Sequence, residues 1–592
     1  MNFKTALLVI WSFFTQLFTP SVIFTQPIDL GGEAWRFQKG DDPTWANPTF
    51  EDSTWQPIAV GMPWQSALQI DYEGFAWYRR NIAISEKEYK KATKKYGSMV
   101  LSLGMIDDAD ETFFNGVKIG RTGAFPPDYM SAWDVPRHYL VPAALIKWGE
   151  ANVIAVRVYD VGGNGGLNGG EYHLEPTTWK NQFTFLIENG EHSNAFALNE
   201  PVVIKTQLVN NSAQKLEGTL TCEIKTFAGK HVATQAQEVK ILRGHRTQAP
   251  NFNFTIPEAG FYISNFIFSQ RDSYGKNTKG YSVKDKKGFS IAPETLKPTP
   301  TQPADFEEYW AKAIAELATV EPNYKLTFSS EYSTSKVEVF EVEMRSLNNV
   351  RVRGFYAKPK EKTDLPAVLH VQGYGSNMLP FSLEHNMAAF YLNIRGHGNS
   401  CEDVHPGFPG YLLTGLKDKN EYIYRGAFMD CLRAIDFLCS RTEVDTNRIA
   451  VEGGSQGGAL SIVTAALDKR VKFCLPDVPF LSNFRLYCEI ANWPANEFKM
   501  HLFKTGKKWD DIYSVLDYFD VTNHAPNVTC PVIMGVGLFD DICPAAINFS
   551  AYNNLSSLEK SYILYPQSGH SLPESHYGVK MKWLYEKFQI SK

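Results

Sequence analysis

The sequence of 592 residues has no surplus of basic residues. Its 59 Lys and Arg are outnumbered by 64 Asp and Glu, which gives a formal net charge of −5. Proteins that bind nucleic acid use clustered Lys and Arg to displace counterions from the phosphates. We therefore predict that nucleic acid is not a partner of this protein.

The sequence also has no apolar run of the roughly 20 residues that cross a bilayer, so we predict no integral membrane segment. At the N-terminus, Lys4 precedes a short apolar run at 6–18, and polar residues follow from Thr19. That order is typical of a secretion signal. We predict that residues 1–25 are a signal peptide and that the protein is exported, to the periplasm or outside the cell. The alternative is a buried N-terminal helix.

CxxC pairs and zinc-type cysteine spacings are missing as well. Seven of the eight cysteines follow residue 400, and their spacing matches neither pattern. A zinc module is therefore excluded. Export would permit disulfides, but no pairing follows from the sequence, and we expect buried free thiols.

The hydrophobic pattern divides the rest of the chain into three parts. Residues 26–178 alternate short strands with turns, and Asn115-Gly116 forms a two-residue hairpin turn between 112–114 and 117–119. Residues 179–292 alternate again, and their length suits an immunoglobulin-like sandwich of about 100 residues. The Pro- and Thr-rich segment 293–303 then marks a boundary.

From residue 304 onward the pattern changes to strands that alternate with helices. Helical stretches such as 425–440 separate nearly continuous apolar runs at 367–371, 389–394, 449–451, 473–475 and 532–536. Strands of this kind are buried on both faces, so the pattern predicts a parallel doubly wound sheet in residues 293–592.

The candidate nucleophile is Ser455. Residues 453–457 read GGSQG and lie between the strand at 448–451 and a helical run at 458–467. A serine in G-x-S-x-G on a sharp strand-to-helix turn is the nucleophile elbow of α/β-hydrolases, with its hydroxyl exposed above the sheet. The alternative is a glycine-rich turn with an incidental serine.

A serine nucleophile needs a base, and the base needs a carboxylate to orient it. In this fold the order along the chain is Ser, acid, His, each at the end of a strand. Asp540 and Asp541 follow the strand at 532–536, and His570 follows a strand at 562–565, with His576 as the later competitor. For the oxyanion hole we expect the backbone N–H of Gln456 and one from the loop 372–375, most simply Tyr374.

The catalytic part resembles carbohydrate esterase family 7, the acetyl xylan esterases and cephalosporin C deacetylases. The matching segments include 303–310 (PADFEEYW), 373–375 (GYG), 395–398 (RGHG), 453–458 (GGSQGG) and 537–544 (GLFDDICP). The resemblance implies removal of acetyl groups from sugar hydroxyls without a metal or other cofactor. It implies a triad of Ser455, Asp540 and His570, with Tyr374 and Gln456 as oxyanion donors.

Two residues depart from the family pattern. His397 stands where the family usually carries Gln, and Ser571 stands where it usually carries Glu. Neither belongs to the implied triad, so we expect hydrolysis to be retained. Both could alter the acyl pocket or its surroundings, which bears on the preference for acetyl groups.

The N-terminal part resembles the galactose-binding-like jelly roll of glycoside hydrolase family 2 enzymes and of sialate O-acetylesterases. Trp55, GFAWYRR at 74–80 and GMIDDADETFFNGVKIG at 104–120 carry this likeness. Such domains bind sugar in some proteins and only support the catalytic domain in others, and we favour support here.

We thus predict a jelly roll at 26–178, an immunoglobulin-like sandwich at 179–292 and an α/β-hydrolase at 293–592. The predicted function is that of a serine esterase that deacetylates polysaccharides or oligosaccharides, with an acetylated carbohydrate as partner. One alternative is an α/β-hydrolase for another ester or a peptide, and another is an inactive carbohydrate-binding surface protein. The sequence leaves open whether the protein forms a homo-oligomer.

Overall fold

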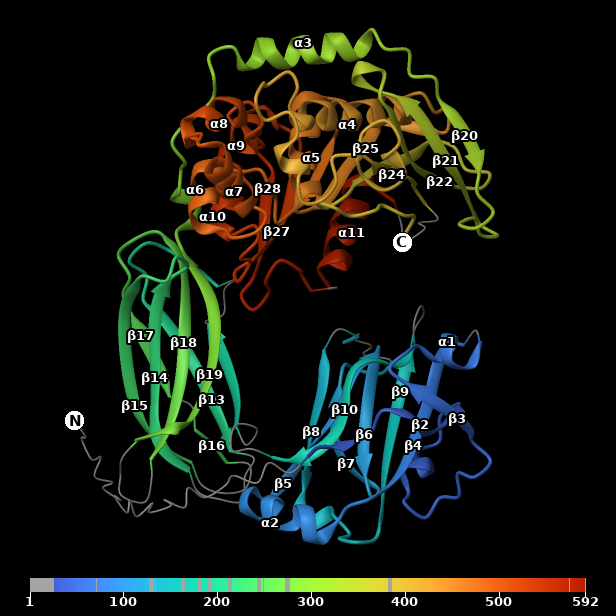
Figure 1. Cartoon of the computed structure of the whole chain (residues 1–592), viewed down its shortest axis with the longest axis vertical. Helices are drawn as coiled ribbons and strands as arrows, with labels where there is room; N and C mark the ends of the chain where they lie inside the picture. The colour runs from blue at the N-terminus through green and yellow to red at the C-terminus, as the bar shows by residue number, and fades with distance from the viewer. Residues whose placement is uncertain are drawn as a thin grey trace, which may run out of the picture.

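The computed structural model describes residues 26–590 except 71, 127–131, 134, 161–164, 178–182, 190–193, 211–215, 242–245, 249, 272–276, 382–385 and 574. The predicted signal peptide and the predicted boundary after residue 178 lie outside the described residues. Figure 1 shows three parts in chain order: a β-rich part in blue, a β-rich part in green, and a larger α/β part in yellow to red. The protein is therefore multidomain, as predicted.

The first β-rich part consists of two packed sheets. One runs in the order β1 (Ile28–Asp29), β10 (Gly166–Pro176), β5 (Ser98–Asp107) and β8 (Pro136–Pro142). The other runs β3 (Gln56–Val60), β2 (Gly32–Lys39), β4 (Gly74–Ala83), β9 (Ala151–Asp160), β6 (Ala109–Phe114) and β7 (Val117–Thr122). Trp35, Trp64 and Tyr78 are buried in the core that strands of both sheets share. Helices α1 (Trp64–Leu68) and α2 (Glu86–Tyr96) complete this part.

The predicted hairpin turn joins β6 to β7. Asn115 and Gly116 have φ angles of 49° and 83°. Positive φ at both central residues matches the twist of the flanking strands, which is why Asn-Gly is favoured there. The local sequence thus correctly predicts this connection.

The second β-rich part also has two sheets. One runs β11 (Phe183–Asn189), β13 (Val202–Asn210) and β16 (Arg246–Gln248), with β17 (Asn251–Phe254) also paired to β13. The other runs β12 (Ala195–Phe196), β19 (Asn277–Ile291), β18 (Gly260–Arg271), β14 (Leu216–Thr226) and β15 (His231–Ile241). Phe252, Phe266 and Phe268 are fully buried in its core.

The α/β part is built on a nine-stranded sheet. Its order is β20 (Lys325–Phe328), β21 (Val337–Arg345), β22 (Arg351–Pro359), β24 (Ala388–Asn393), β23 (Leu365–Val371), β25 (Val444–Gly454), β26 (Phe473–Asp477), β27 (Val532–Gly537) and β28 (Lys560–Tyr565). The strands from β24 to β28 pair in parallel, whereas β20, β21 and β22 pair antiparallel. The prediction of a parallel sheet therefore holds for the buried strands and misses three edge strands. Of these strands, β21 (VEVFEVEMR) mostly alternates apolar and charged residues, which is typical of a half-exposed antiparallel strand.

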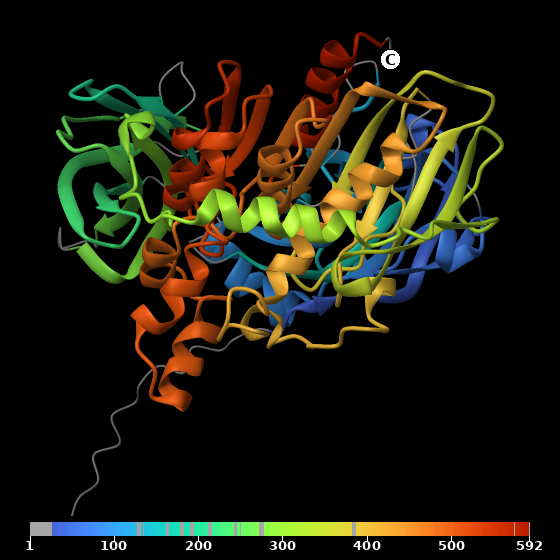
Figure 2. The ribbon, with the colours of Figure 1, turned by 90° about the horizontal axis from the view of Figure 1, so that it is seen from above.

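Helices cover both faces of this sheet. They are α3 (Phe306–Ala318), α4 (Ile423–Cys439), α5 (Gln456–Leu467), α6 (Phe484–Ile490), α7 (Asn496–Thr505), α8 (Trp509–Leu516), α9 (Val521–His524), α10 (Ala545–Asn554) and α11 (Ser575–Phe588). In β25, Ala450 packs in one cluster with Leu584 of α11, while Val451 packs in another with α4 and α5. This alternation along one strand is what burial on both faces requires. Figure 2 shows α3, in light green, lying across the α/β part.

All eight cysteines lie in the described residues and are free, and five of them are buried. The expected free thiols are therefore present. Among the described residues, no helix is both long and apolar enough to span a membrane.

Candidate active site

Ser455 lies on a strained turn between β25 and α5. Its φ and ψ are 60° and −118°, a conformation that non-glycine residues rarely adopt. The Ser455 N–H donates to the Asp477 carbonyl at 2.9 Å, and the Phe480 N–H donates to the Ser455 carbonyl at 3.0 Å. Neighbouring loops thus hold the strained turn from both sides, and such strain is concentrated at functional sites.

The glycines around Ser455 are needed for close packing. A Cβ atom added at Gly453 or Gly457 would lie 2.5 or 2.2 Å from the Val371 carbonyl oxygen, and one at Gly458 would lie 2.5 Å from that of Asp477. These distances are shorter than any ordinary contact, and the atoms met are backbone atoms that cannot move aside. The small residues of the motif therefore allow the elbow to approach β23 and β26.

Asp540 and His570, the candidate acid and base, are in contact. After β27, Asp540 is fully buried, and its Oδ2 lies 2.9 Å from His570 Nδ1. Its Oδ1 accepts the N–H groups of Ile542 at 2.9 Å and Cys543 at 2.7 Å. These bonds fix the carboxylate, which in turn fixes the imidazole ring. Asp541 is exposed, so of the two adjacent carboxylates the structure brings Asp540 to the histidine.

The Ser455 hydroxyl lies beside a buried thiol. Its Oγ is 3.9 Å from the Sγ of Cys543, and in the described part of the chain it has no hydrogen bond to His570. Catalytic hydrogen bonds are often long in free enzymes and tighten when substrate binds. Burial raises the pKa of the Cys543 thiol, which keeps it neutral next to the nucleophile. The sequence analysis did not single out Cys543; its position three residues after Asp540 was the available signal.

Gln456 begins α5, so its N–H is among those with no partner inside the helix. Its side chain is buried, and the Tyr424 hydroxyl donates to Gln456 Oε1 at 2.7 Å. The Gln456 side chain therefore helps to hold the backbone N–H of the same residue in place.

His397 packs beneath the loop that carries Tyr374. Its Nε2 accepts the N–H of Gly375 at 3.3 Å and the side-chain amide of Gln456 at 3.2 Å, while its Nδ1 donates to the Arg395 carbonyl at 3.4 Å. Burial lowers the pKa of His397 to about 4, so the ring stays neutral and Nε2 stays an acceptor. His397 thus connects the residue that follows Tyr374 with the side chain of Gln456. Ser571, the other departure from the family pattern, directly follows His570 and is exposed.

The Tyr374 side chain is anchored by α7. Its hydroxyl donates to Glu497 Oε1 at 3.0 Å and accepts the N–H of Leu412 at 3.2 Å. Glu497 also accepts the Gly410 N–H at 2.9 Å, and the Phe408 ring lies 4.9 Å from the Tyr374 ring. The sequence analysis missed Glu497, because only the tertiary fold brings α7 to this loop.

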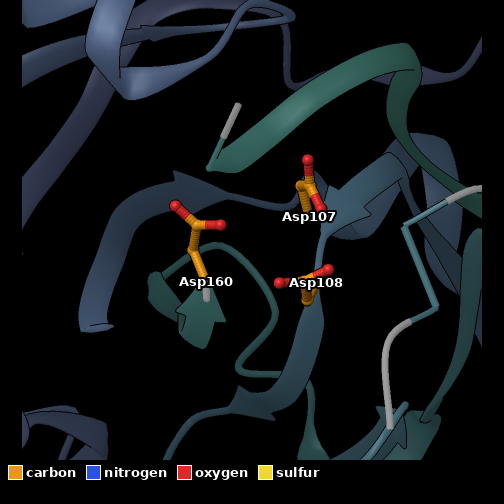
Figure 3. Close-up of side chains that lie close together, drawn as sticks. All are labelled: Asp107, Asp108 and Asp160. Carbon is orange, nitrogen blue, oxygen red and sulfur yellow. The ribbon is translucent and has the colours of Figure 1, made fainter. Parts of the chain in front are cut away.

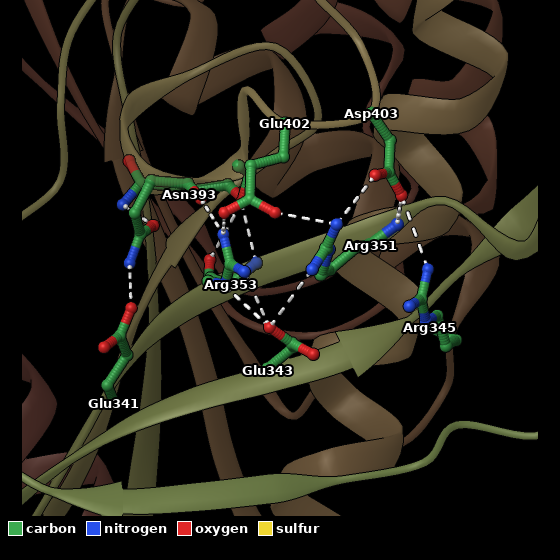
Figure 4. Close-up of polar contacts among 10 residues, drawn as sticks. Glu341, Glu343, Arg345, Arg351, Arg353, Asn393, Glu402 and Asp403 are labelled. Atoms are coloured by element: carbon green, nitrogen blue, oxygen red, sulfur yellow. Dashed lines mark hydrogen bonds and ion pairs between the residues drawn. The ribbon is translucent and has the colours of Figure 1, made fainter.

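A network of charged residues holds the turn that follows β24 (Figure 4). Arg353 of β22 lies 2.7 Å from Glu343 and 3.0 Å from Glu402. Arg351 lies 2.7 Å from Glu402 and 3.1 Å from Asp403. A network of charges that share partners contributes more to folding stability than isolated exposed ion pairs do. The network fastens the turn to the antiparallel edge of the sheet.

His576 belongs to a buried polar network on the other side of the elbow. Its Nε2 lies 2.7 Å from Asp477 Oδ1, and its Nδ1 lies 2.9 Å from the Tyr565 hydroxyl. Lys580 contacts Asp477 and also Glu452, at 2.8 Å. The structure therefore places His576 away from the acid–base pair.

One group of carboxylates in the described residues has metal-like spacing. Asp107 and Asp108, at the end of β5, and Asp160, at the end of β9, offer oxygens within 4.8 Å of one another, as Figure 3 shows. A set of oxygens alone suits Ca²⁺ or Mg²⁺ rather than Zn²⁺. All three residues interact with other groups, and acidic clusters are common without an ion, so we assign no metal here.

The fold and this site are those of an α/β-hydrolase esterase. A mixed sheet presents a serine elbow, a buried aspartate on an imidazole, and loop N–H groups at the ends of its parallel strands. The chain belongs to the acetyl xylan esterase family, because the family model described as Acetyl xylan esterase (AXE1) matches residues 293–587. It is therefore a carboxylic ester hydrolase.

Three relatives illustrate the extent of the likeness. The acetyl esterase Axe7A of Xylanibacter ruminicola is 30% identical over 318 residues, which are 50% of this chain and 70% of that protein. The acetyl xylan esterase from Paenibacillus sp. R4 is 32% identical, with a TM-score of 0.47, over 50% of this chain and 98% of its own. Acetyl Xylan Esterase 1 from Thermoanaerobacterium sp. is 29% identical, with a TM-score of 0.47, over 50% and 97%. The residues that the family model matches, 293–587, are those of the α/β part.

Proposed function

We propose that this protein removes acetyl groups from acetylated polysaccharides or oligosaccharides, with Ser455, His570 and Asp540 as the catalytic triad. The observation that carries the proposal is the 2.9 Å contact between buried Asp540 and His570, in the region that the family model matches. The printed names of the relatives, acetyl esterase and acetyl xylan esterase, support the acetyl group and the sugar.

In the proposed reaction, Ser455 Oγ attacks the acetyl carbonyl carbon while His570 takes its proton. The tetrahedral oxyanion accepts hydrogen bonds from the N–H groups of Tyr374 and Gln456, each typically worth about 3 kcal/mol. The sugar oxygen then leaves with the proton from His570, and the acetyl group stays on Ser455. Water, deprotonated by His570, releases acetate and restores the serine.

We further propose that residues 1–25 direct export and that residues 293–592 form the esterase domain. The two sheets around one aromatic core support a galactose-binding-like jelly roll for 26–178. The paired sheets of the second part support an immunoglobulin-like sandwich for 179–292.

Acetate release from acetylated xylo-oligosaccharides and other acetylated glycans tests the function. We expect release with the wild-type protein and none with Ser455→Ala, whose fold should be unchanged. A larger kcat/KM for butyryl than for acetyl p-nitrophenyl esters would contradict a small acyl pocket. Failure of a fluorophosphonate probe to label Ser455 would favour an inactive carbohydrate-binding protein instead.

A further inference from the structure

The second β-rich part touches the two loops that carry the acid and the base. The C-terminal end of β19 meets the α/β part, and Figure 1 shows the upper ends of β18 and β19 directly below that part. Gly288 of β19 donates its N–H to the carbonyl of Pro566 at 2.9 Å. Lys286, two residues earlier, places its ammonium 4.4 Å from the centre of the Phe539 ring. Phe539 directly precedes Asp540, and Pro566 lies in the loop that leads to His570.

We propose that β19 is a positioning element for catalysis: Lys286 and Gly288 hold the Asp540 loop and the His570 loop in register with each other. This inference rests on the proposed triad. It gives the central β-rich part a role in the chemistry that adds to the contacts within the catalytic part.

The two loops are already tied to each other, so a contact on one is transmitted to the other. The Phe539 N–H donates to the Ser568 carbonyl at 2.9 Å, and the Leu538 N–H donates to the Tyr565 carbonyl at 3.0 Å. β19 adds a fixed surface that contacts both the Asp540 loop and the His570 loop. A shift of that surface would change the separation of Asp540 and His570.

Gly288 is the point of closest approach. A Cβ atom at this position would lie 2.6 Å from the Leu538 Cβ and 3.3 Å from the Pro566 carbonyl oxygen. The first distance is too short for a real contact, and a Cβ cannot swing away as the end of a long side chain can. A methyl group at Gly288 must therefore push β19 and the loops apart.

Lys286 holds the Asp540 loop through the charge of its ammonium group. An ammonium over an aromatic face is attracted by the negative charge of the ring face. Phe539 is half-buried and Lys286 is exposed, so this contact is available without distorting either chain segment.

Contacts farther along the same interface prevent β19 from sliding. The rings of Phe261 and Phe549 lie 5.3 Å apart, and the Asn553 side chain donates to the carbonyls of Pro293 at 2.9 Å and Leu296 at 2.7 Å. These contacts fasten β18 and the linker to α10. β19 thus meets the catalytic loops from a fixed position.

Substitution of Gly288 in the full-length protein tests the proposal. Because a misplacement of about 1 Å can cost about 100-fold in rate, we expect Gly288→Val to lower kcat for p-nitrophenyl acetate by about 10- to 100-fold. KM should change little, and labelling of Ser455 by the fluorophosphonate should slow in parallel. Gly288→Ala should give a smaller loss in the same direction.

Two glycines of the same sandwich serve as controls. A Cβ at Gly218 would lie 2.2 Å from the Ser269 carbonyl oxygen, so Gly218→Ala should destabilise the sandwich without touching the catalytic loops. A Cβ at Gly260 would meet nothing closer than 3.4 Å, so Gly260→Ala should be tolerated. Both variants should keep the wild-type kcat. An equal loss of kcat in Gly218→Ala and Gly288→Val would overturn the positioning role.

Lys286 gives a test that does not depend on packing. Lys286→Met should lower kcat several-fold at unchanged thermal stability, and Lys286→Arg should restore it because the cation is retained. Wild-type kcat in both Lys286→Met and Gly288→Val, with an inactive Ser455→Ala, would reject the role of β19 and leave the proposed triad standing. An active Ser455→Ala would reject the triad itself.

Discussion

At the scale of single residues, the surroundings of His570 and His576 favour His570 as the base of the proposed triad. His570 is part-exposed and contacts the buried Asp540 carboxylate, whereas His576 is buried between Asp477 and Tyr565. We expect His570→Ala to abolish ester hydrolysis with little loss of stability. His576→Gln should retain most of the hydrolysis but unfold at lower urea concentration, because a buried hydrogen-bonded ring is replaced. Assays of kcat and urea midpoints on both variants check this, and an inactive, fully stable His576→Gln would contradict it.

The adjacent carboxylates Asp540 and Asp541 allow a similarly sharp comparison. In Asp540→Asn, the amide can still accept from the loop N–H groups but no longer holds the tautomer of His570 or stabilises its charged form. In a serine protease, replacing the aspartate that plays the corresponding role with asparagine lowered kcat by about four orders of magnitude. We expect a loss of that size for Asp540→Asn and less than about 3-fold for the exposed Asp541→Asn. Comparable small losses in the two variants would mean that the acid lies elsewhere.

Candidates for the proposed triad could be chosen from the sequence, because this fold places each member of such a triad at a strand end. G-x-S-x-G marks Ser455, and the order Ser, Asp, His narrows the remaining choices to Asp540 or Asp541 and to His570 or His576. The sequence alone could not reveal Cys543 as the neighbour of the serine or Glu497 as the partner of Tyr374. Both contacts depend on how loops from separate strands fold over the elbow.

At the scale of elements, α7 holds the loop that carries Tyr374 through the carboxylate of Glu497. Glu497→Ala would leave the Tyr374 hydroxyl and the Gly410 N–H without their acceptor, at a cost of about 1–3 kcal/mol in the free energy of unfolding. The Tyr374 backbone should then be less well placed, so kcat should fall as well. Urea denaturation and p-nitrophenyl acetate kinetics measure the two effects. Glu489→Ala, an exposed carboxylate on α6, is the control and should change neither.

The elements also show where pattern reasoning stops. Continuous apolar runs identify the buried strands β23 to β27, because strands covered on both faces carry few polar residues. The run VEVFEVEMR of β21 alternates instead, with half of its side chains partly exposed, so it gives no sign of joining the same sheet. Its place follows from antiparallel pairing with β22, which only the folded chain reveals.

At the scale of the whole molecule, two buried neutral histidines make stability depend on pH. Burial lowers the pKa of His397 to about 4 and that of His524 to about 3. His524 packs against Phe306 and Trp310, and its Nε2 lies 3.2 Å from the Tyr518 carbonyl oxygen. In the unfolded chain both rings would titrate near 6.5. The unfolded state therefore binds more protons than the folded state as the pH falls below that value.

Stability should consequently fall on acidification between pH 7.5 and pH 5, before most carboxylates titrate. Each of these two histidines contributes a loss of about 2 kcal/mol over that window, since a folded-state pKa below the unfolded value favours the unfolded state at lower pH. His397→Gln should remove about half of the combined loss. Glutamine can still accept the Gly375 N–H, and the family usually carries it, so the variant should fold. Urea denaturation at pH 7.5, 6.5, 5.5 and 5 gives the slope of the unfolding free energy against pH for the wild-type protein and for the variant. A wild-type slope in His397→Gln would show that His397 is protonated equally in the folded and unfolded states, in conflict with its burial and with its role as an acceptor for Gly375 and Gln456.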